Sequence, residues 1–168
     1  YDIMSSDWSS DVCSSDLVTL FHEFGHLMHD LLTKAPLSAQ SGTSTKRDFV
    51  EVPSQLLEHW AWEYESLKRF ALHYQTGDNL PEELHQKMVD TKNVDSGLFT
   101  LQQIFYAMLD MTFHDRYDPE NDPRSTTEVV KELQNNITLF DYMEDTHFQA
   151  GFGHLYGYAA GYYGYMWA

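Results

Sequence analysis

The chain has 168 residues, enough to enclose one hydrophobic core, and a formal net charge of −16 from 26 Asp and Glu against 10 Lys and Arg. This acidity argues against nucleic acid and an anionic membrane as partners, because both are bound through clustered basic side chains. No apolar run reaches the roughly 18 residues of a membrane-spanning helix. The single cysteine, Cys13, excludes an intramolecular disulfide, which fits a reducing compartment, and we expect a cytoplasmic protein.

The first 17 residues differ in composition from the rest of the chain. The triplet Ser-Ser-Asp occurs there at positions 5–7, 9–11 and 14–16, without an amphipathic period. The segment resembles the translation of a sequencing adapter, although a genuine linker rich in Ser and Asp would have the same composition. We therefore predict a non-native, adapter-like segment at 1–17 and a partial domain, truncated at both ends, at 18–168.

Residues 18–32 are apolar with helical periodicity, and they contain an HExxH motif formed by His22, Glu23 and His26. On a helix the two histidines lie one turn apart on the same face, so both imidazoles can reach one metal ion. Glu23 lies beside them, where it can polarise a metal-bound water. The alternative is a surface helix with two unrelated histidines, because the motif fixes only three positions.

The donor set indicates which metal such a helix would hold. Imidazoles combined with a carboxylate suit Zn²⁺, with a fourth position left open for water or substrate. A structural zinc site would instead fill all four positions with Cys and His, and the metzincin pattern would need a glycine at position 29 and a histidine at position 32. The chain has His29 and Leu32 there. The motif is therefore typical of a zinc peptidase outside the metzincins.

Beyond the motif the sequence continues to predict helices. Residues 37–46 are rich in Gly, Ser and Thr and follow Pro36, and they predict a loop or short extended segment. A long helix is expected over 52–74, with Pro53 in its first turn and Gly77 as the stop that follows. Pro81 is expected to open another short helix.

The C-terminal half adds two further predicted helices. Asp95 is a candidate cap for a helix whose apolar residues recur at helical spacing as far as Phe113. Ser125 followed by Glu128 forms a capping-box pattern for a helix through about Leu133. No stretch alternates as a strand would, so we expect an all-α fold.

Five separate segments closely match one known family. They are Phe-His-Glu-Phe-Gly-His-Leu-Met-His at 21–29, Ser-Gly-Thr at 41–43, Arg-Asp-Phe-Val-Glu-Val-Pro-Ser-Gln-Leu-Leu-Glu-His-Trp at 47–60, and the stretches 97–104 and 152–165. Together they resemble the thimet oligopeptidase family of zinc metallopeptidases, in order from about Val18 to Ala168. Members of that family are typically several times longer, so the resemblance implies a fragment of the catalytic region.

The resemblance implies that His22, His26 and Glu51 bind one Zn²⁺ per chain. The residues agree with it, because the site needs a third ligand and Glu51 lies near the start of a second helix that can pack across the HExxH helix. We therefore expect a multi-helix, zincin-type catalytic core in which this second helix carries the third ligand. The alternative for Glu51 is a solvated carboxylate or a helix cap.

The resemblance also gives roles to neighbouring residues. Glu23 would be the general base towards the water and then the proton donor to the leaving amine, the alternative being a surface carboxylate. Three residues are candidates for holding the imidazole N–H groups, although each could equally be a solvated side chain: Asp30, Gln55 and Glu58. His29 matches a recurrent family position and is expected to be structural.

The C-terminal residues are the second informative stretch. The resemblance implies that His154, Tyr158 and Tyr165 lie on a glycine-rich loop over the active site, where the tyrosine hydroxyls donate hydrogen bonds to the oxyanion of the tetrahedral intermediate. By composition alone, the stretch is equally compatible with an aromatic core turn. Because the sequence ends three residues after Tyr165, we expect this loop to be displaced or disordered in the chain as it stands.

The function that follows is zinc-dependent hydrolysis of short peptides, with Glu23 as general base. The resemblance implies a deep channel that admits short peptides and excludes folded proteins; the oligomeric state stays open. One alternative is a dipeptidyl carboxypeptidase of the same family, for which the sequence identifies no positive group to hold the substrate carboxylate. The other is a metal-binding helical fragment without turnover.

Overall fold

The computed structural model describes residues 14–168, so most of the predicted segment 1–17 lies outside the described residues. In the described part the regular elements are helices, and the only β-type pairing is an isolated bridge between Leu72 and Asn79. The predicted all-α class is therefore confirmed. No helix within residues 14–168 is both long and apolar enough to cross a membrane.

The chain divides into two compact units. Unit 1 contains the described residues up to Lys46 together with Val50–Val94, and unit 2 contains Arg47–Phe49 together with Asp95–Ala168. In unit 1, α1 (Ser14–Leu31) confirms the helix predicted over 18–32 and begins four residues earlier.

The second helix differs from its prediction at both ends. α2 (Arg47–Glu58) begins five residues before the expected position 52, and Pro53 lies well inside it rather than in its first turn. Proline has no backbone N–H, so the helix continues past Pro53 with one backbone hydrogen bond fewer. After Glu58 the chain forms a 3₁₀ helix, His59–Trp62, and the extended backbone of Glu63 (φ −87°, ψ 122°) separates it from α3 (Tyr64–Leu67). The single long helix expected over 52–74 is wrong.

α4 (Glu82–Thr91) completes unit 1. It begins directly after Pro81, as predicted. Gly77, with a φ of 76°, lies in the turn that precedes it. The hydroxyl of Tyr64 donates a hydrogen bond to the main-chain carbonyl of Leu80 at 3.1 Å, which joins this turn to α3.

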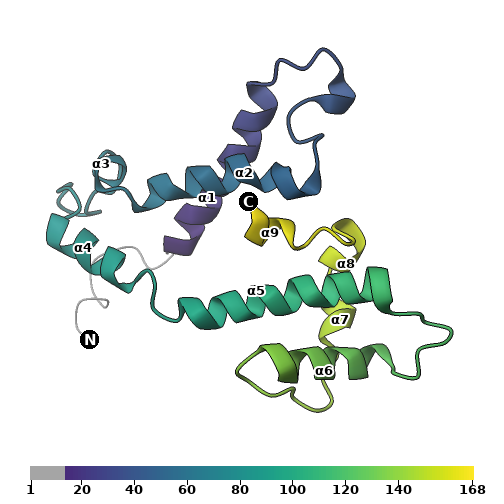
Figure 1. Ribbon diagram of the computed structural model, residues 1–168. Coiled ribbons are helices and arrows are strands. Elements are labelled where there is room, and N and C mark those ends of the chain that lie inside the picture. Colours follow the sequence, from purple (N-terminus) through teal and green to yellow (C-terminus); the bar gives the residue numbers. More distant parts are fainter. Residues whose placement is uncertain (1–13) are drawn as a thin grey trace. The chain divides into compact units, whose positions relative to one another are not determined.

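α1 and α2 cross each other (Figure 1). Their backbones approach closely at Gly25. A Cβ atom on this glycine would lie 2.4 Å from Cα of Ser54 and 2.6 Å from the main-chain oxygen of Pro53. Real Cβ atoms do not approach backbone atoms so closely, so only glycine leaves room for α2 here. This contact fixes the distance between the HExxH helix and the helix that carries Glu51.

The loop between these two helices is fastened to the C-terminal end of α1. The main-chain N–H of Thr43 donates a hydrogen bond to Oδ1 of Asp30 at 2.7 Å, and the Thr43 hydroxyl donates to the same oxygen at 3.1 Å. Gly42 has a φ of 50°, and a Cβ atom there would lie 1.8 Å from Asp30 Oδ1, so this position requires glycine. The loop therefore returns to α1 shortly before α2 begins.

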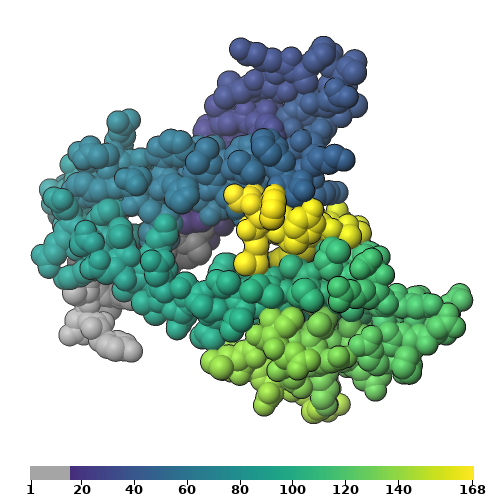
Figure 2. All heavy atoms as spheres, viewed as in Figure 1, coloured from purple at the N-terminus to yellow at the C-terminus, as the bar shows by residue number. Residues whose placement is uncertain are grey.

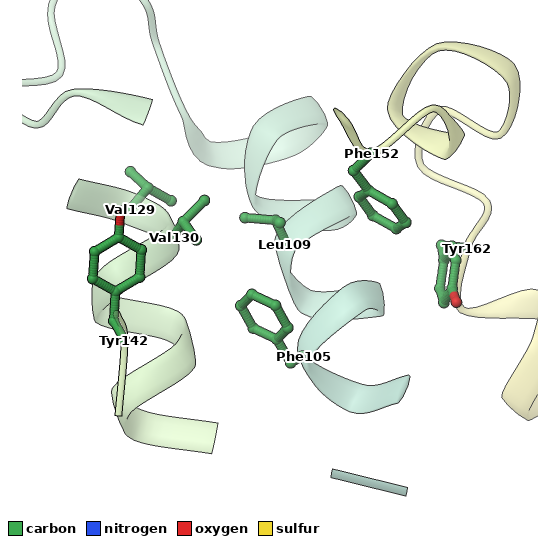
Figure 3. Packing of buried hydrophobic residues seen from close by; sticks show 7 residues of the cluster. All are labelled: Phe105, Leu109, Val129, Val130, Tyr142, Phe152 and Tyr162. Carbon is green, nitrogen blue, oxygen red and sulfur yellow. The ribbon is translucent and has the colours of Figure 1, made fainter. Parts of the chain in front are cut away.

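Unit 2 is built on α5 (Ser96–Met111), which packs against α6 (Thr126–Ile137) (Figure 1). A π-helical turn, Thr112–Arg116, follows α5. The short helices α7 (Phe148–Gly151), α8 (His154–Gly157) and α9 (Gly164–Trp167) lie in the C-terminal part. The core joins α5 and α6 to the C-terminal part of the chain (Figure 3); its buried members are Phe105, Leu109, Val129, Val130, Tyr142, Phe152 and Tyr162.

The two predicted caps in unit 2 have different outcomes. The capping box is confirmed, because Ser125 Oγ accepts a hydrogen bond from the N–H of Glu128 while the Glu128 carboxylate accepts one from the N–H of Ser125 at 2.6 Å. The helix it opens runs to Ile137, four residues beyond the predicted end. Asp95 precedes α5 as expected, but it has a left-handed backbone (φ 60°) and its side chain makes no capping hydrogen bond.

The C-terminal residues pack on α5 within unit 2, and the expectation that this loop is displaced or disordered stays a prediction. Figure 2 shows this segment, in yellow, lying against α5. Tyr162 is only 7% exposed, and its hydroxyl donates a hydrogen bond to Oε1 of Gln103 at 3.0 Å. Aromatic burial and hydrogen bonds to α5 therefore anchor the segment from within unit 2.

Candidate metal centre and the tyrosine segment

Three of the predicted site residues converge in unit 1. α1 contributes His22 and His26, one turn apart, and α2 contributes Glu51. Nε2 of each histidine lies 3.3 Å from Oε2 of Glu51, and the ligand atoms of the three residues all lie within 4.8 Å of one another. The two imidazole rings are nearly perpendicular, at 85°, with centroids 4.9 Å apart.

This geometry fits a tetrahedral metal ion. Two ligand atoms bound at about 2.0–2.1 Å to such an ion are about 3.3–3.4 Å apart, which matches both imidazole–carboxylate distances. Glu51 is 1% exposed, and a buried carboxylate is costly unless its charge is compensated. A divalent cation between the imidazoles and the carboxylate would supply that compensation.

Two further side chains orient these three. Oε1 of Glu58 lies 2.7 Å from Nδ1 of His22, so a proton on Nδ1 directs the lone pair of Nε2 towards Glu51. The hydroxyl of Ser54 lies 3.0 Å from Oε2 of Glu51 and 2.8 Å from the main-chain oxygen of the same residue. The role expected for Glu58 therefore has a contact to support it. The sequence analysis did not predict this role for Ser54. Its position three residues after Glu51, on the same face of a helix, could have indicated it.

The other neighbours of the centre differ from one another. Near the C-terminal end of α1, the carboxylate of Asp30 accepts hydrogen bonds from the main-chain N–H and the hydroxyl of Thr43. The structure therefore gives Asp30 a contact with the loop and not the candidate contact with an imidazole. Gln55 is half-buried on α2. Nδ1 of His26 is buried and has no hydrogen-bond partner among residues 14–168. Glu23 is exposed on α1 beside His22, where its carboxylate is accessible to water.

The remaining predicted site residues come together in unit 2, in residues 152–165, called here the tyrosine segment. The rings of Tyr158 and Tyr165 stack with centroids 5.4 Å apart at 20°. The ring of His154 meets both of them edge-on, and Nε2 of His154 lies 3.5 Å from the hydroxyl of Tyr165. The guanidinium of Arg47 lies over the ring of Tyr158, 4.4 Å from its centroid.

Two of the other tyrosines in this segment, Tyr162 and Tyr163, are held by hydrogen bonds to side chains. Burial raises the pKa of Tyr162 to about 12, so its hydroxyl stays protonated and continues to donate to Gln103. The hydroxyl of Tyr163 donates a hydrogen bond to Oδ2 of Asp48 at 3.2 Å, and this bond to a carboxylate raises the pKa of Tyr163.

Comparison with known proteins identifies the class. Residues 12–168 match the sequence model of peptidase family M3. The chain belongs to this family, which confirms the resemblance to thimet oligopeptidases. The match begins at residue 12 and α1 begins at Ser14, so the boundary expected at residue 17 stays a prediction.

Individual relatives agree with that assignment. The chain is 41% identical over 155 residues to the mitochondrial intermediate peptidase of Arabidopsis thaliana, an alignment covering 92% of this chain and 22% of that protein. It is 38% identical over 156 residues to oligopeptidase A of Salmonella typhimurium, covering 91% and 23% respectively. The human mitochondrial intermediate peptidase is 39% identical over 152 residues, covering 90% and 21%. The chain therefore spans less than a quarter of the length of these relatives.

Proposed function

We propose that this chain is part of the catalytic region of a zinc-dependent peptidase that hydrolyses short peptides. The observation that carries the proposal is the convergence of His22, His26 and Glu51 at tetrahedral spacing in a chain of peptidase family M3. Two imidazoles and one carboxylate form a donor set that suits Zn²⁺ and leaves one position open. Bound there, Zn²⁺ would polarise a peptide carbonyl and lower the pKa of a water molecule.

The chain's own residues supply the proton transfers and the orientation. Glu23, exposed next to His22, would accept the proton of the attacking water and pass it to the leaving amine. Glu58 would hold the Nδ1 proton of His22, and Ser54 would fix the carboxylate of Glu51. By resemblance to the family, the hydroxyls of Tyr158 and Tyr165 would donate hydrogen bonds to the developing oxyanion of the substrate.

The test separates metal binding from turnover. The chain is freed of metal with a chelator, titrated with Zn²⁺ and assayed for cleavage of a short fluorogenic peptide. We expect one Zn²⁺ per chain, lost in a His22→Ala variant. In the full-length protein that carries these residues, Glu23→Gln should keep zinc and lower cleavage by about 10²-fold or more, because the general base is removed.

A control and two alternative outcomes complete this test. Glu82→Gln changes an exposed carboxylate on α4 and should leave cleavage unchanged. Near-normal turnover of the Glu23→Gln variant would reject the mechanism. Zinc binding without peptide cleavage by this chain, beside cleavage by the full-length protein, would support the alternative of a metal-binding helical fragment without turnover.

One observation favours dipeptidyl carboxypeptidase activity as a second candidate. That reaction needs a cation for the substrate carboxylate, and Arg47 lies against Tyr158 without an ion pair among residues 14–168. If Arg47 has this role, Arg47→Gln should raise KM for peptides with a free C-terminus and not for the same peptides amidated. Arg69→Gln, also exposed, is the matched control. Equal rates on free and amidated peptides would exclude this candidate.

Short peptides are the partners that we propose. The net charge of −16 argues against nucleic acid and an anionic membrane, which are bound through clustered basic side chains. Residues 18–168 contain no cysteine, and on that basis we propose a cytoplasmic location.

A further inference from the structure

The carboxylate of Asp110 lies buried beneath the tyrosine segment. Asp110 is in the last turn of α5 and is 0% exposed. Its Oδ1 accepts a hydrogen bond from the main-chain N–H of Ala160 at 3.0 Å, and its Oδ2 accepts one from the N–H of Tyr162 at 3.0 Å. Two main-chain hydrogen bonds to one buried side chain therefore hold the segment to α5.

The two amides that Asp110 binds flank an unfavourable turn. Ala160 has a φ of 55°, the left-handed region that residues with a Cβ atom rarely adopt. The next residue is Gly161, whose N–H donates to the main-chain oxygen of Tyr158 at 2.7 Å. A non-glycine residue in this conformation persists only where its surroundings hold it, and here the carboxylate of Asp110 holds both sides of the turn.

This turn lies between the two stacked tyrosines in the sequence. It reverses the chain between Tyr158 and Tyr165, whose rings then stack at 5.4 Å. Tyr162 lies between them in the core and is tied to α5 through Gln103. If the turn opened, Tyr158 would move while Tyr165, which follows the buried Tyr162, would stay in place.

The surroundings of Asp110 include one other titratable side chain. Nδ1 of His114, in the π-helical turn after α5, lies 2.9 Å from Oδ1 of Asp110 and 2.8 Å from its main-chain oxygen. Both carboxylate oxygens of Asp110 still reach the amides of the turn, so His114 adds to this arrangement without replacing it.

We propose that Asp110 is a positioning residue that sets the spacing between the hydroxyls of Tyr158 and Tyr165. The inference rests on the proposed function, in which these hydroxyls act on the oxyanion. Asp110 itself acts only through the main chain of residues 160–162. Its loss should therefore affect the transition state more than substrate binding.

The first experiment uses Asp110→Asn in the full-length protein. Asparagine has nearly the same shape as aspartate, but an NH₂ group replaces one of the two carboxylate oxygens. This donor would face the main-chain N–H of Ala160 or Tyr162, so one of the two hydrogen bonds is lost. A displacement of about 1 Å at a reacting group costs on the order of 10²-fold in rate. We expect kcat to fall by about 10- to 100-fold, with KM within about twofold and zinc content unchanged. Asp115→Asn, an exposed carboxylate in the π-helical turn, should be neutral.

A double-mutant comparison separates positioning from loss of structure. With Tyr158→Phe and Tyr165→Phe already present, Asp110→Asn should lower kcat little further, because the hydroxyls it positions are gone. An equal fall in both backgrounds would mean a general structural role and overturn the proposal. If the tyrosine variants alone keep wild-type kcat, the oxyanion role in the proposed function fails. If they lower kcat while Asp110→Asn does not, only the present inference fails.

A surface substitution tests the same turn without touching the core. Ala160 is exposed, so Ala160→Val should fold, but a β-branched residue at this φ is strongly disfavoured and should open the turn. We expect the same fall in kcat as for Asp110→Asn. Conversely, Ala160→Gly removes the strain and should restore part of the activity lost in Asp110→Asn. Wild-type kcat for Ala160→Val would overturn the proposal, whether or not Asp110→Asn can be purified.

Discussion

Substitution of Gly25 by alanine should disrupt the proposed metal centre without changing any of its three proposed ligands. The added methyl would lie 2.4 Å from Cα of Ser54, 2.6 Å from the main-chain oxygen of Pro53 and 2.9 Å from the main-chain nitrogen of Ser54. All three are backbone atoms, so no rotamer change can relieve the contact. Carbon atoms are in favourable contact at about 3.5–4.0 Å, and α1 and α2 must therefore separate by about 1–1.5 Å.

The metal centre cannot absorb such a shift. Gly25 lies between the two histidines on α1, and Glu51 lies one turn before Ser54 on α2, so the separation is transmitted to the distances of 3.3 Å between Nε2 and Oε2. Two donors at about 2.1 Å from one ion cannot be more than about 4.2 Å apart, even on opposite sides of it. A separation of 1 Å or more thus reaches that limit, and Glu51 is lost as a ligand.

We therefore expect Gly25→Ala to lower zinc affinity by at least about 10²-fold, beyond the usual effect of changing a residue that merely supports a ligand. The affinity is measured by competition with a chromophoric chelator, and helix content by circular dichroism. Gly97→Ala is the matched control, because this helical glycine in α5 has nothing within 4 Å of its Cβ position. Wild-type zinc affinity in Gly25→Ala would refute the view that this contact sets the ligand geometry.

Four further outcomes are expected. Glu58→Gln should weaken zinc binding by about 10- to 100-fold in the same competition assay, because His22 loses its carboxylate partner. In the full-length protein, Tyr158→Phe and Tyr165→Phe should each lower kcat by roughly 10²–10³-fold with little change in KM, as measured by steady-state kinetics. Tyr156 is exposed, so Tyr156→Phe is the control and should leave both constants unchanged. Ser125→Ala should lower the free energy of unfolding by about 1 kcal/mol in urea titrations. Hydrogen bonds from the main-chain N–H and then from the hydroxyl of Ser125 lower the pKa of Glu128. Alanine keeps the N–H, so only the part of the stability loss that comes from the hydroxyl bond to the carboxylate depends on pH. That part should be present above the usual Glu pKa and fade as pH falls through the lowered value. A chain beginning at Val18 should keep its zinc affinity.

Local patterns predicted the elements that depend on local interactions. The period of apolar residues in 18–32 predicted α1, and Ser125 with Glu128 predicted the start of α6, because a capping box is complete within four residues. The positions of His22 and His26 followed from the helical repeat alone. Glu51 needed the family resemblance, since nothing within α1 specifies which later carboxylate will reach it.

The errors lie where tertiary contacts override local preference. Pro53 was expected in a first turn, but α2 begins at Arg47, whose side chain lies on Tyr158 over a hundred residues later. Asp95 is a favoured capping residue, yet its backbone is left-handed and its side chain makes no capping hydrogen bond. The sequence did not predict a role for Asp110, which lies within an apolar helical pattern. Its partners are main-chain amides about 50 residues later, and no local pattern indicates them.

Gly25, one of the three residues between the two histidines, nevertheless indicates where the helix with the third ligand can pack. On a helix, positions three apart share a face, so Gly25 lies on the same face of α1 as His22. By the same rule, Ser54 lies on the same face of α2 as Glu51. Each helix thus places a small residue three positions after a ligand, and these two small residues are the ones in contact. A large side chain at either position would hold the helices apart and leave the carboxylate short of the imidazoles. A glycine inside HExxH, followed later by a carboxylate with a small residue three positions on, therefore predicts two closely crossing helices with the third ligand on the second.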